Sequence, residues 1–167
     1  EIMSKALYIS YFGVREPLVQ TQVIPYLREL KKLESLPPRP RNADTSPNQT
    51  GPPEVSLLTF EPDGHFDAEH IRAELAAEGI EWHRLRYHKR PSVPATLFDV
   101  LNGARFIAKL MRRERFDILH ARSHVPMLMA AIARISSLRK PKVVFDIRGF
   151  FPEEYTDAGI WPEGGWL

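Results

Sequence analysis

The densest group of chemically capable side chains comprises His120, Arg122 and Ser123, at the end of an apolar run. The guanidinium fork of Arg122 could orient a hydroxyl or a phosphate group through several donors at once. Structural roles are open for its neighbours. Ser123 stands where a helix N-cap belongs, and His120 could be a half-buried, hydrogen-bonded imidazole. All three are candidate site residues, and Arg122 is a candidate catalytic group.

A second group follows the next apolar run, where Asp146 and Arg148 lie a few residues before Glu153. An aspartate at the carboxyl end of a central strand can accept a hydrogen bond from a substrate hydroxyl, which makes Asp146 the second candidate catalytic group. An ion pair between Asp146 and Arg148 that shapes the loop is the structural alternative. Both interpretations are open on the sequence.

The loop after the first apolar run contains a single glycine, Gly13. A dinucleotide site would have Gly-x-Gly-x-x-Gly at this point, and a nucleotide-hydrolysing loop would need Gly-x-x-x-x-Gly-Lys-Ser/Thr. Neither pattern occurs. Cysteine is absent as well, which excludes disulfides, thiolate metal ligands and a cysteine nucleophile. We expect neither a metal nor a cofactor.

Apolar runs that alternate with helical patterns indicate how these groups are positioned. The expected strands cover residues 5–11, 54–60, 80–86, 117–121 and 142–146. The expected helices cover residues 18–33, 67–78, 96–113 and 125–136. This alternation predicts an α/β fold with a Rossmann-like, doubly wound parallel sheet in three layers. In the usual strand order for such a sheet, 3-2-1-4-5, the loops after strands one, four and five line the ligand crevice.

Helical periodicity also predicts which side chains face the core. Asp67 is expected to cap the second helix and Gly79 to end it, and Pro25 is expected to start or kink the first helix. The expected core positions are Val23, Leu27 and Leu30 in the first helix, Leu97, Leu101, Ala104, Ala108 and Met111 in the third, and Leu128, Ile132 and Ile135 in the fourth.

Residues 1–167 are expected to form one domain, with a Pro-rich, poorly ordered insertion at 35–53. The net charge of +2 gives no reason to expect nucleic acid as a partner. Two basic stretches, 84–90 and 112–115, are typical of solvated faces, with attraction to an anionic membrane surface as the alternative. Since the sequence has no membrane-spanning run and no signal layout, we expect a cytoplasmic protein, with peripheral contact at the cytoplasmic membrane face as a further option.

Several segments, taken in chain order, are similar to the opening of family 4 retaining glycosyltransferases. They are residues 6–10, Pro17-Leu18, residues 20–27, 55–61 and 117–123, and Asp146-Ile147-Arg148-Gly149 with Glu153-Glu154, Gly159 and Trp161. The set covers nearly the whole chain except 35–53. The order of the segments carries the resemblance more than any single motif does.

The resemblance implies the N-terminal half of a GT-B architecture, in which two Rossmann-like domains face each other across a cleft. The first domain mainly binds the acceptor. The second, absent from this chain, holds a nucleotide-sugar as donor substrate, and no metal is needed. The implied activity is retaining transfer of a sugar to a glycan or lipid-linked acceptor by a hexosyltransferase, with this chain inactive alone and its C-terminal donor-binding domain as partner.

By the same resemblance, the loop at Gly13 would face the donor phosphates and Arg122 would lie near the transferred sugar. Asp146, Arg148 and Glu153 would line the acceptor pocket, and Gln20 belongs to a matched segment at the cleft. The subgroup tends to have a glycine where this chain has valine at position 19, which leaves close backbone approach to phosphate in question. Two other readings stay open, a stand-alone binding module without catalysis and part of a GT-B nucleotide-sugar epimerase.

Overall fold

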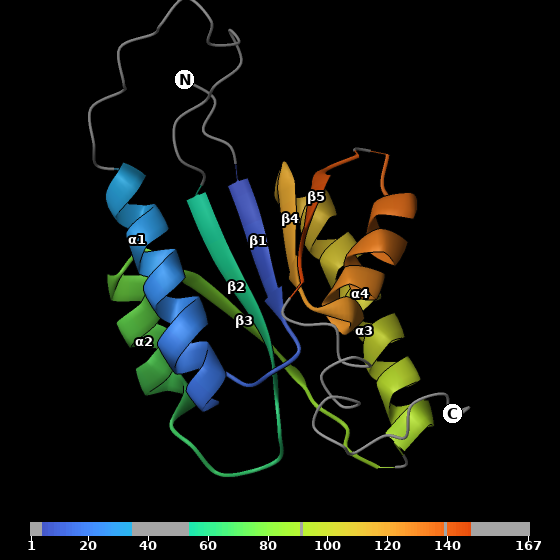
Figure 1. The fold of residues 1–167 in the computed structure, drawn as a ribbon, viewed down its shortest axis with the longest axis horizontal. Coiled ribbons are helices and arrows are strands. Elements are labelled where there is room, and N and C mark those ends of the chain that lie inside the picture. The colour runs from blue at the N-terminus through green and yellow to red at the C-terminus, as the bar shows by residue number, and fades with distance from the viewer. Residues whose placement is uncertain (1–4, 35–53, 91, 139, 148–167) are drawn as a thin grey trace, which may run out of the picture.

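The structure, a computed structural model, describes residues 5–34, 54–90, 92–138 and 140–147 (Figure 1). Over these ranges, one parallel sheet has the strand order β3-β2-β1-β4-β5. Its strands are β1 (Lys5–Ser10), β2 (Glu54–Glu61), β3 (Glu81–Arg86), β4 (Ile118–Arg122) and β5 (Lys142–Asp146). The predicted α/β fold class and strand order are therefore confirmed. The expected insertion at 35–53 lies outside the described residues.

Helices cover both faces of the sheet and make three layers (Figure 1). One face carries the short π-helix η1 (Val19–Val23), α1 (Ile24–Glu34) and α2 (Ala68–Ala77), and the other carries α3 (Ser92–Arg113) and α4 (His124–Ile135). Because all five strands run parallel, their carboxyl ends share one edge of the sheet. We call this the carboxyl edge; it is formed by Ser10, Glu61, Arg86, Arg122, Asp146 and the loops that follow them.

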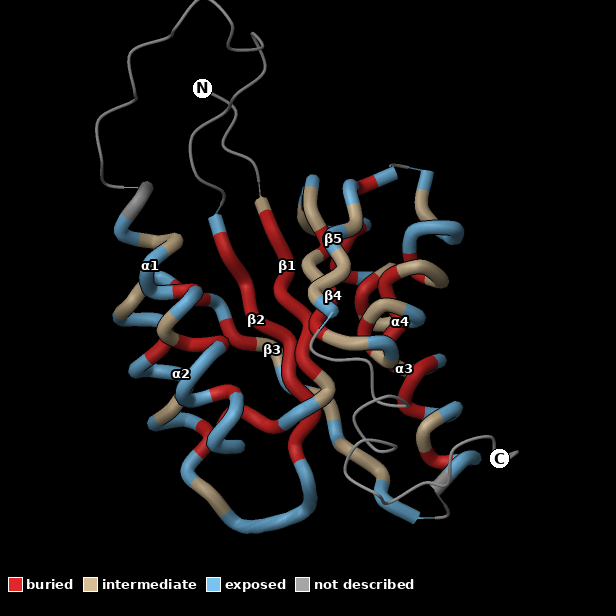
Figure 2. The backbone as a smooth tube through the Cα atoms, viewed as in Figure 1, coloured by how far each residue is buried: buried red, intermediate tan, exposed pale blue. Residues whose placement is uncertain are grey.

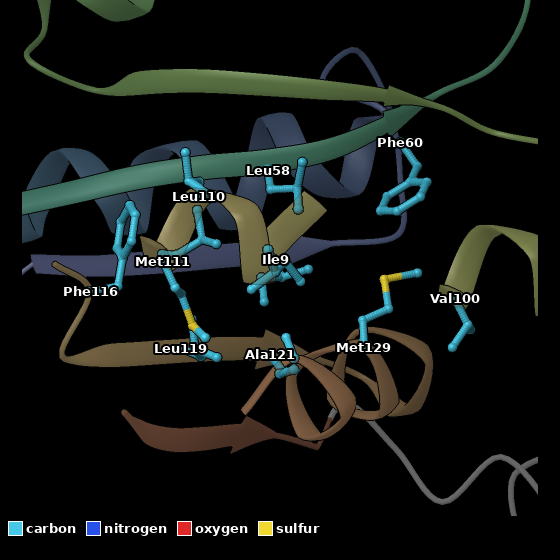
Figure 3. Packing of buried hydrophobic residues seen from close by; sticks show 14 residues of the cluster. Ile9, Leu58, Phe60, Val100, Leu110, Met111, Phe116, Leu119, Ala121 and Met129 are labelled. Atoms are coloured by element: carbon cyan, nitrogen blue, oxygen red, sulfur yellow. The ribbon is translucent and has the colours of Figure 1, made fainter. Parts of the chain in front are cut away.

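The two faces of the sheet enclose separate apolar cores because neighbouring residues of a strand point to opposite sides. Leu7 and Ile9 point toward α3 and α4, where they pack with Phe60, Leu119 and Met129 (Figure 3). Other strand side chains pack under η1, α1 and α2, namely Tyr8, Leu57 and Trp82. Figure 2 shows the resulting continuous burial along the central strands.

The predicted cap and stop of α2 and two predicted core positions before and within α1 are confirmed. The Asp67 carboxylate accepts a hydrogen bond from the backbone N–H of His70 at 2.9 Å, and Gly79 adopts a φ of 73° just beyond the helix. Val23 and Leu27 are fully buried, as their spacing predicted. Pro25 lies at the second position of α1, but η1 leads directly into α1, so its missing N–H falls inside a continuous helical run. The turn before it is the wider π-turn of η1, which accommodates a residue that cannot donate a helical hydrogen bond.

The predicted core face of α3 was wrong in its first half. Leu97 and Leu101 are 57% and 49% exposed, whereas Val100, Ala104 and Ile107 are buried. The first half of α3 carries large apolar side chains on more of its circumference than the sheet and α4 cover, so periodicity alone could not select the packed stripe. The helix also begins at Ser92, four residues before the expected start.

The predicted core face of α4 was wrong as well. Leu128 and Ile135 are exposed, and the core positions are Met129, Ala130 and Ala133. The small side chains of Ala130 and Ala133 let α4 lie close to the sheet, which a count of large apolar residues does not reveal. No described helix is long and apolar enough to cross a membrane.

Gly103 lies where α3 packs closely against the buried core, so a substitution there measures how tight this packing is. A Cβ at this position would lie 2.6 Å from the Met129 sulfur and 2.9 Å from the Phe60 ring, both in the buried core. We expect Gly103→Ala to lower the free energy of unfolding by about 1–3 kcal/mol, because an overpacked core must shift. Urea unfolding followed by circular dichroism measures the change. Gly64→Ala is the matched control, since a Cβ there meets no atom within 4 Å; equal losses for the two variants would contradict the packing argument.

Candidate functional site

The parallel register places four polar or aromatic side chains on one face of the sheet. Tyr8 is paired with His120 across β1 and β4, and Arg122 is paired with Asp146 across β4 and β5. Residues two apart on a strand share a face. All four side chains therefore point to the side of the sheet that carries α1. They lie in the parts of the strands that approach the carboxyl edge.

These side chains contact one another in a chain. The Arg122 guanidinium donates to the Tyr8 hydroxyl at 3.5 Å, and that hydroxyl donates to Asp146 Oδ2 at 3.4 Å. His120 Nε2 lies 3.9 Å from the same carboxylate oxygen. The Tyr8 and His120 rings pack with centroids 4.5 Å apart, and Tyr26 of α1 closes the stack at 5.8 Å from His120.

Arg122 is the buried member of this arrangement. It is 3% exposed, and its guanidinium also donates to Gln22 Oε1 in η1. A buried charge is tolerated only when hydrogen bonds replace its lost hydration, so Gln22 and Tyr8 are needed to keep Arg122 in place. We call Tyr8, Gln22, His120, Arg122 and Asp146 the polar cluster.

Besides the exposed Gln22, Asp146 and His120 are the accessible members of the polar cluster. Their side chains are 20% and 16% exposed, so a ligand at the carboxyl edge can reach them. The carboxylate contributes hydrogen-bond acceptors, and the imidazole contributes a donor or an acceptor according to its tautomer. This arrangement is suited to binding a hydroxyl group.

Gly13 has a packing role in the loop after β1. A Cβ there would lie 2.8 Å from Glu61 Oε2, so the loop can approach this carboxylate only with glycine. Glu61 is 6% exposed, and its other oxygen accepts hydrogen bonds from the Val14 N–H at 2.7 Å and from the Thr59 hydroxyl. The Trp82 indole N–H in turn donates to Thr59. This chain of bonds fastens the loop to β2.

Gln20, a predicted cleft residue, supports the same loop. Its Nε2 donates to the Val14 carbonyl oxygen at 2.7 Å. Val19, where the resemblance led us to expect glycine, is fully buried in the core beneath η1. The Gly13 loop is therefore held by Glu61 on one side and by Gln20 on the other.

Asp99 in α3 holds the opposite side of the β1 loop. This carboxylate is fully buried and accepts hydrogen bonds from the Tyr11 hydroxyl at 2.9 Å and from the His88 N–H at 2.9 Å. His88 Nδ1 also lies 2.6 Å from Asp99 Oδ1. Burial and the hydrogen bond to Asp99 raise the pKa of the Tyr11 hydroxyl above its ordinary range, so this phenol keeps its proton.

A cavity of about 260 Å³ lies at the carboxyl ends of β2 and β3. Arg84, Arg86, Phe66 and Glu61 are among its lining residues. Arg86 is paired with Asp63 at 2.7 Å, whereas Arg84 stacks toward the Phe66 ring and, within the described ranges, forms no ion pair. Glu61 connects this cavity to the loop at Gly13.

Ser123 adopts a backbone conformation that only glycine adopts easily. Its φ and ψ are 74° and 176°, and it is the one non-glycine residue with positive φ in the described part of the chain. It occupies the N-cap position of α4, as predicted, but its side chain makes no capping hydrogen bond. Its backbone N–H donates to the Asp146 carbonyl oxygen at 3.0 Å, which ties the ends of β4 and β5 together.

The structure thus brings together three of the predicted site residues, His120, Arg122 and Asp146, with Ser123 next to them. Gly13 and Gln20 belong to the neighbouring loop, and Arg148 and Glu153 lie outside the described residues. Sequence reasoning missed Tyr8, Gln22 and Tyr26. Tyr8 could have been found from the parallel register of β1 with β4, whereas Gln22 could not, because its direction depends on the π-turn of η1.

The strain at Ser123 gives a testable difference between two substitutions. Ser123→Gly relieves the strained φ and should raise the free energy of unfolding by about 1 kcal/mol. Ser123→Ala keeps the strain and removes no capping bond, so it should change stability by less than about 0.5 kcal/mol. Thermal unfolding of both variants checks the pair. A clear loss for Ser123→Ala would mean that the hydroxyl does cap the helix.

Two comparisons with known proteins match this chain. A family model described as "Glycosyltransferase Family 4" matches residues 53–167. Among solved structures, a glycosyltransferase from Rickettsia africae ESF-5 is 17% identical with a TM-score of 0.56, covering 95% of this chain and 34% of that chain. A ferredoxin-NADP+ reductase from Plasmodium falciparum gives 12% identity and a TM-score of only 0.38, covering 86% of this chain and 53% of that chain. The search of curated proteins found no match.

The rickettsial structure shares the fold of this chain, and the chain spans about a third of its length. The family model covers more than half of the chain, from the start of β2 through the polar side chains of β4 and β5. The chain belongs to glycosyltransferase family 4.

Proposed function

We propose that this chain is the acceptor-binding N-terminal domain of a retaining glycosyltransferase of GT-B architecture. The full protein would move a sugar from a nucleotide-sugar to a glycan or a lipid-linked acceptor, with the donor held by a C-terminal partner domain. The observation that carries the proposal is the polar cluster, in which Asp146 and His120 reach solvent at the carboxyl edge in front of a buried Arg122. Membership of the glycosyltransferase family supports it.

Asp146 is the group best suited to touch the acceptor. A carboxylate can accept several hydrogen bonds, so Asp146 can bind a sugar hydroxyl while it keeps its contact with Tyr8. In the proposed reaction, the bond between the anomeric carbon and the nucleotide phosphate breaks, and a bond from that carbon to the acceptor oxygen forms. The proton of the acceptor hydroxyl passes to the leaving phosphate. The part of this chain is to bind that hydroxyl and orient it.

Arg122 acts as a positioning residue in this proposal. Its guanidinium is buried, and its hydrogen bonds go to Gln22 and Tyr8. It therefore reaches Asp146 through the Tyr8 hydroxyl. It also joins η1 to the sheet at the base of the Gly13 loop, the segment that would face the donor phosphates.

The cavity beside β2 and β3 is the proposed place for a more distant part of the acceptor. It opens at the same carboxyl edge as the polar cluster, and Glu61 belongs both to its wall and to the support of the Gly13 loop. Arg84 offers guanidinium donors there, and Phe66 offers an apolar ring. Sugars and their anionic substituents are bound by this combination of groups.

The role of Asp146 is tested in the full-length protein by Asp146→Asn. We expect kcat/KM for transfer from a nucleotide-sugar to fall about 10- to 100-fold, because a hydrogen bond to a charged acceptor is lost at the reacting hydroxyl. Release of nucleoside diphosphate and the mass of the product give the rate. Asp117→Asn is the matched control, since this exposed carboxylate lies at the opposite edge of the sheet, where it binds the Lys5 N–H.

Two outcomes would contradict the proposed function. Transfer by the purified 1–167 chain alone would show that no second domain is needed. Epimerised nucleotide-sugar without transfer would assign the fold to the isomerase class.

The cavity is tested by Arg84→Gln. If it binds the acceptor, KM for the acceptor should rise about tenfold, through the loss of a charged hydrogen bond, while KM for the nucleotide-sugar stays constant. Arg72→Gln, an exposed arginine of α2 that pairs with Glu69, is the control. An unchanged acceptor KM for Arg84→Gln would leave the polar cluster as the acceptor site and exclude the cavity.

A further inference from the structure

A histidine and a buried carboxylate that the proposed reaction does not use form a pair at the carboxyl edge. His88 Nδ1 lies 2.6 Å from Oδ1 of Asp99, and the backbone N–H of His88 donates to Oδ2 of the same carboxylate at 2.9 Å. Asp99 is fully buried in α3, whereas 31% of the His88 side chain is exposed. The imidazole is therefore the part of this pair that a ligand can reach.

The Asp99 carboxylate decides which nitrogen of His88 carries the proton. A carboxylate accepts hydrogen bonds, so in the neutral imidazole the proton lies on Nδ1 and the lone pair lies on Nε2. The Tyr11 hydroxyl donates to the same carboxylate at 2.9 Å. Burial and this bond raise the pKa of the Tyr11 phenol, so Tyr11 remains a donor. Asp99 thus accepts from both of its neighbours, and Nε2 is left as the acceptor atom of the ring.

The Nε2 atom of His88 is accessible to a ligand. Because the two nitrogens lie on different edges of the imidazole, Nε2 points away from the carboxylate that holds Nδ1. Within the described ranges, Nε2 forms no hydrogen bond. The buried side-chain atoms that lack a partner there are Ser56 Oγ and His83 Nε2. Since His88 Nε2 is not one of them, its lone pair reaches solvent.

The pair of His88 and Asp99 is held close to the end of β1. The Tyr87 N–H donates to the Glu61 carbonyl oxygen at 2.8 Å, which fastens the chain just before His88 to the end of β2. Tyr11, which binds Asp99, comes directly after β1. The polar cluster reaches the same edge from the α1 side of the sheet, and the pair reaches it from the α3 side. The two groups therefore flank the tip of β1.

An exposed aromatic ring lies next to the imidazole. The Phe98 ring is 56% exposed, and its centroid lies 5.1 Å from that of His88 at an interplanar angle of 88°. A sugar presents both hydroxyl groups and an apolar face of C–H groups, so it can use an apolar ring beside a hydrogen-bond acceptor. An inorganic anion makes no use of the ring and is repelled by the lone pair.

We propose that His88 Nε2 accepts a hydrogen bond from a hydroxyl of the acceptor sugar, with Asp99 as the positioning residue. This inference rests on the proposed function, because it adds a substrate contact at the same carboxyl edge. The hydroxyl is not the reacting one, since Asp146 lies on the other side of the sheet from α3. His88 therefore determines which acceptors bind and how tightly, and it does not change the rate at which the bound acceptor reacts.

Two substitutions separate the contact with the sugar from the support of Asp99. The probes are the methyl glycosides of glucose, galactose, mannose and N-acetylglucosamine, offered as acceptors to the full-length protein. His88→Asn keeps an amide N–H opposite Asp99 but places no atom at Nε2. We expect its acceptor KM to rise about tenfold through the loss of one hydrogen bond, with kcat and the melting temperature unchanged.

The second substitution has the opposite pattern. His88→Gln places its amide near Nε2 but removes the ring donor from Asp99. It should restore the acceptor KM to within about threefold of the wild type and lower the melting temperature by a few degrees. His70→Asn is the matched control, because His70 is an exposed histidine 3.3 Å from a carboxylate oxygen of Glu74 in α2, on the opposite face of the sheet. It should keep the acceptor KM of the wild type.

Labelling with diethyl pyrocarbonate tests the contact without any transfer. This reagent modifies imidazole nitrogens that carry an accessible lone pair, and mass spectrometry identifies the modified residue. In the full-length protein we expect labelling of His88 and protection of His88 by at least one of the methyl glycosides. His70 is the internal reference, since its labelling should not change when the sugar is added.

Three results would overturn the inference. The first is an unchanged KM of His88→Asn for every glycoside that serves as acceptor. The second is labelling of His70 without labelling of His88, which would mean that the second domain covers Nε2. The third is labelling of His88 that no glycoside reduces, or that inorganic phosphate reduces instead. Failure of the proposed function gives a different result, namely protection of His88 by a glycoside to which no sugar is transferred.

Discussion

The buried carboxylate of Glu61 is the interaction on which the arrangement of the site depends. It accepts the Val14 N–H and the Thr59 hydroxyl, and it lies so close to the loop that position 13 has room only for glycine. A buried carboxylate that lost these donors would be costly, so the loop and β2 hold each other in place. That loop leads into η1, and η1 carries Gln22 to Arg122.

The polar cluster shows why a parallel sheet is a good support for such a site. Tyr8, Arg122 and Asp146 come from three strands that are far apart in the sequence, and the ladder hydrogen bonds of the sheet align them without any loop. These three side chains are therefore positioned by the sheet itself, whereas Gln22 is positioned by η1. The strained backbone at Ser123 lies directly after it, where the ends of β4 and β5 are joined.

The two sides of helix α3 lie in different surroundings. Its inner side packs into the main core and places Asp99 under the loops after β1 and β3, whereas its outer side presents apolar and basic groups. This division explains why the helix has more large apolar residues than one packed face needs. It also explains why periodicity selected Leu97 and Leu101 as core positions, since helical spacing does not tell an apolar stripe that packs on the sheet from one that is exposed.

The sequence by itself determined the alternation of strands and helices, the cap at Asp67 and the polar loops at the carboxyl edge, whereas the strand order was taken as the usual one for such a sheet. These features follow from local propensity and from the handedness of βαβ units, which act over short stretches of chain. Only the tertiary structure decided which side of α3 and α4 is buried, that Gln22 reaches Arg122, and that Gly13 makes room for Glu61. Those outcomes depend on the volumes and hydrogen-bond partners supplied by residues distant in sequence, which no single segment contains.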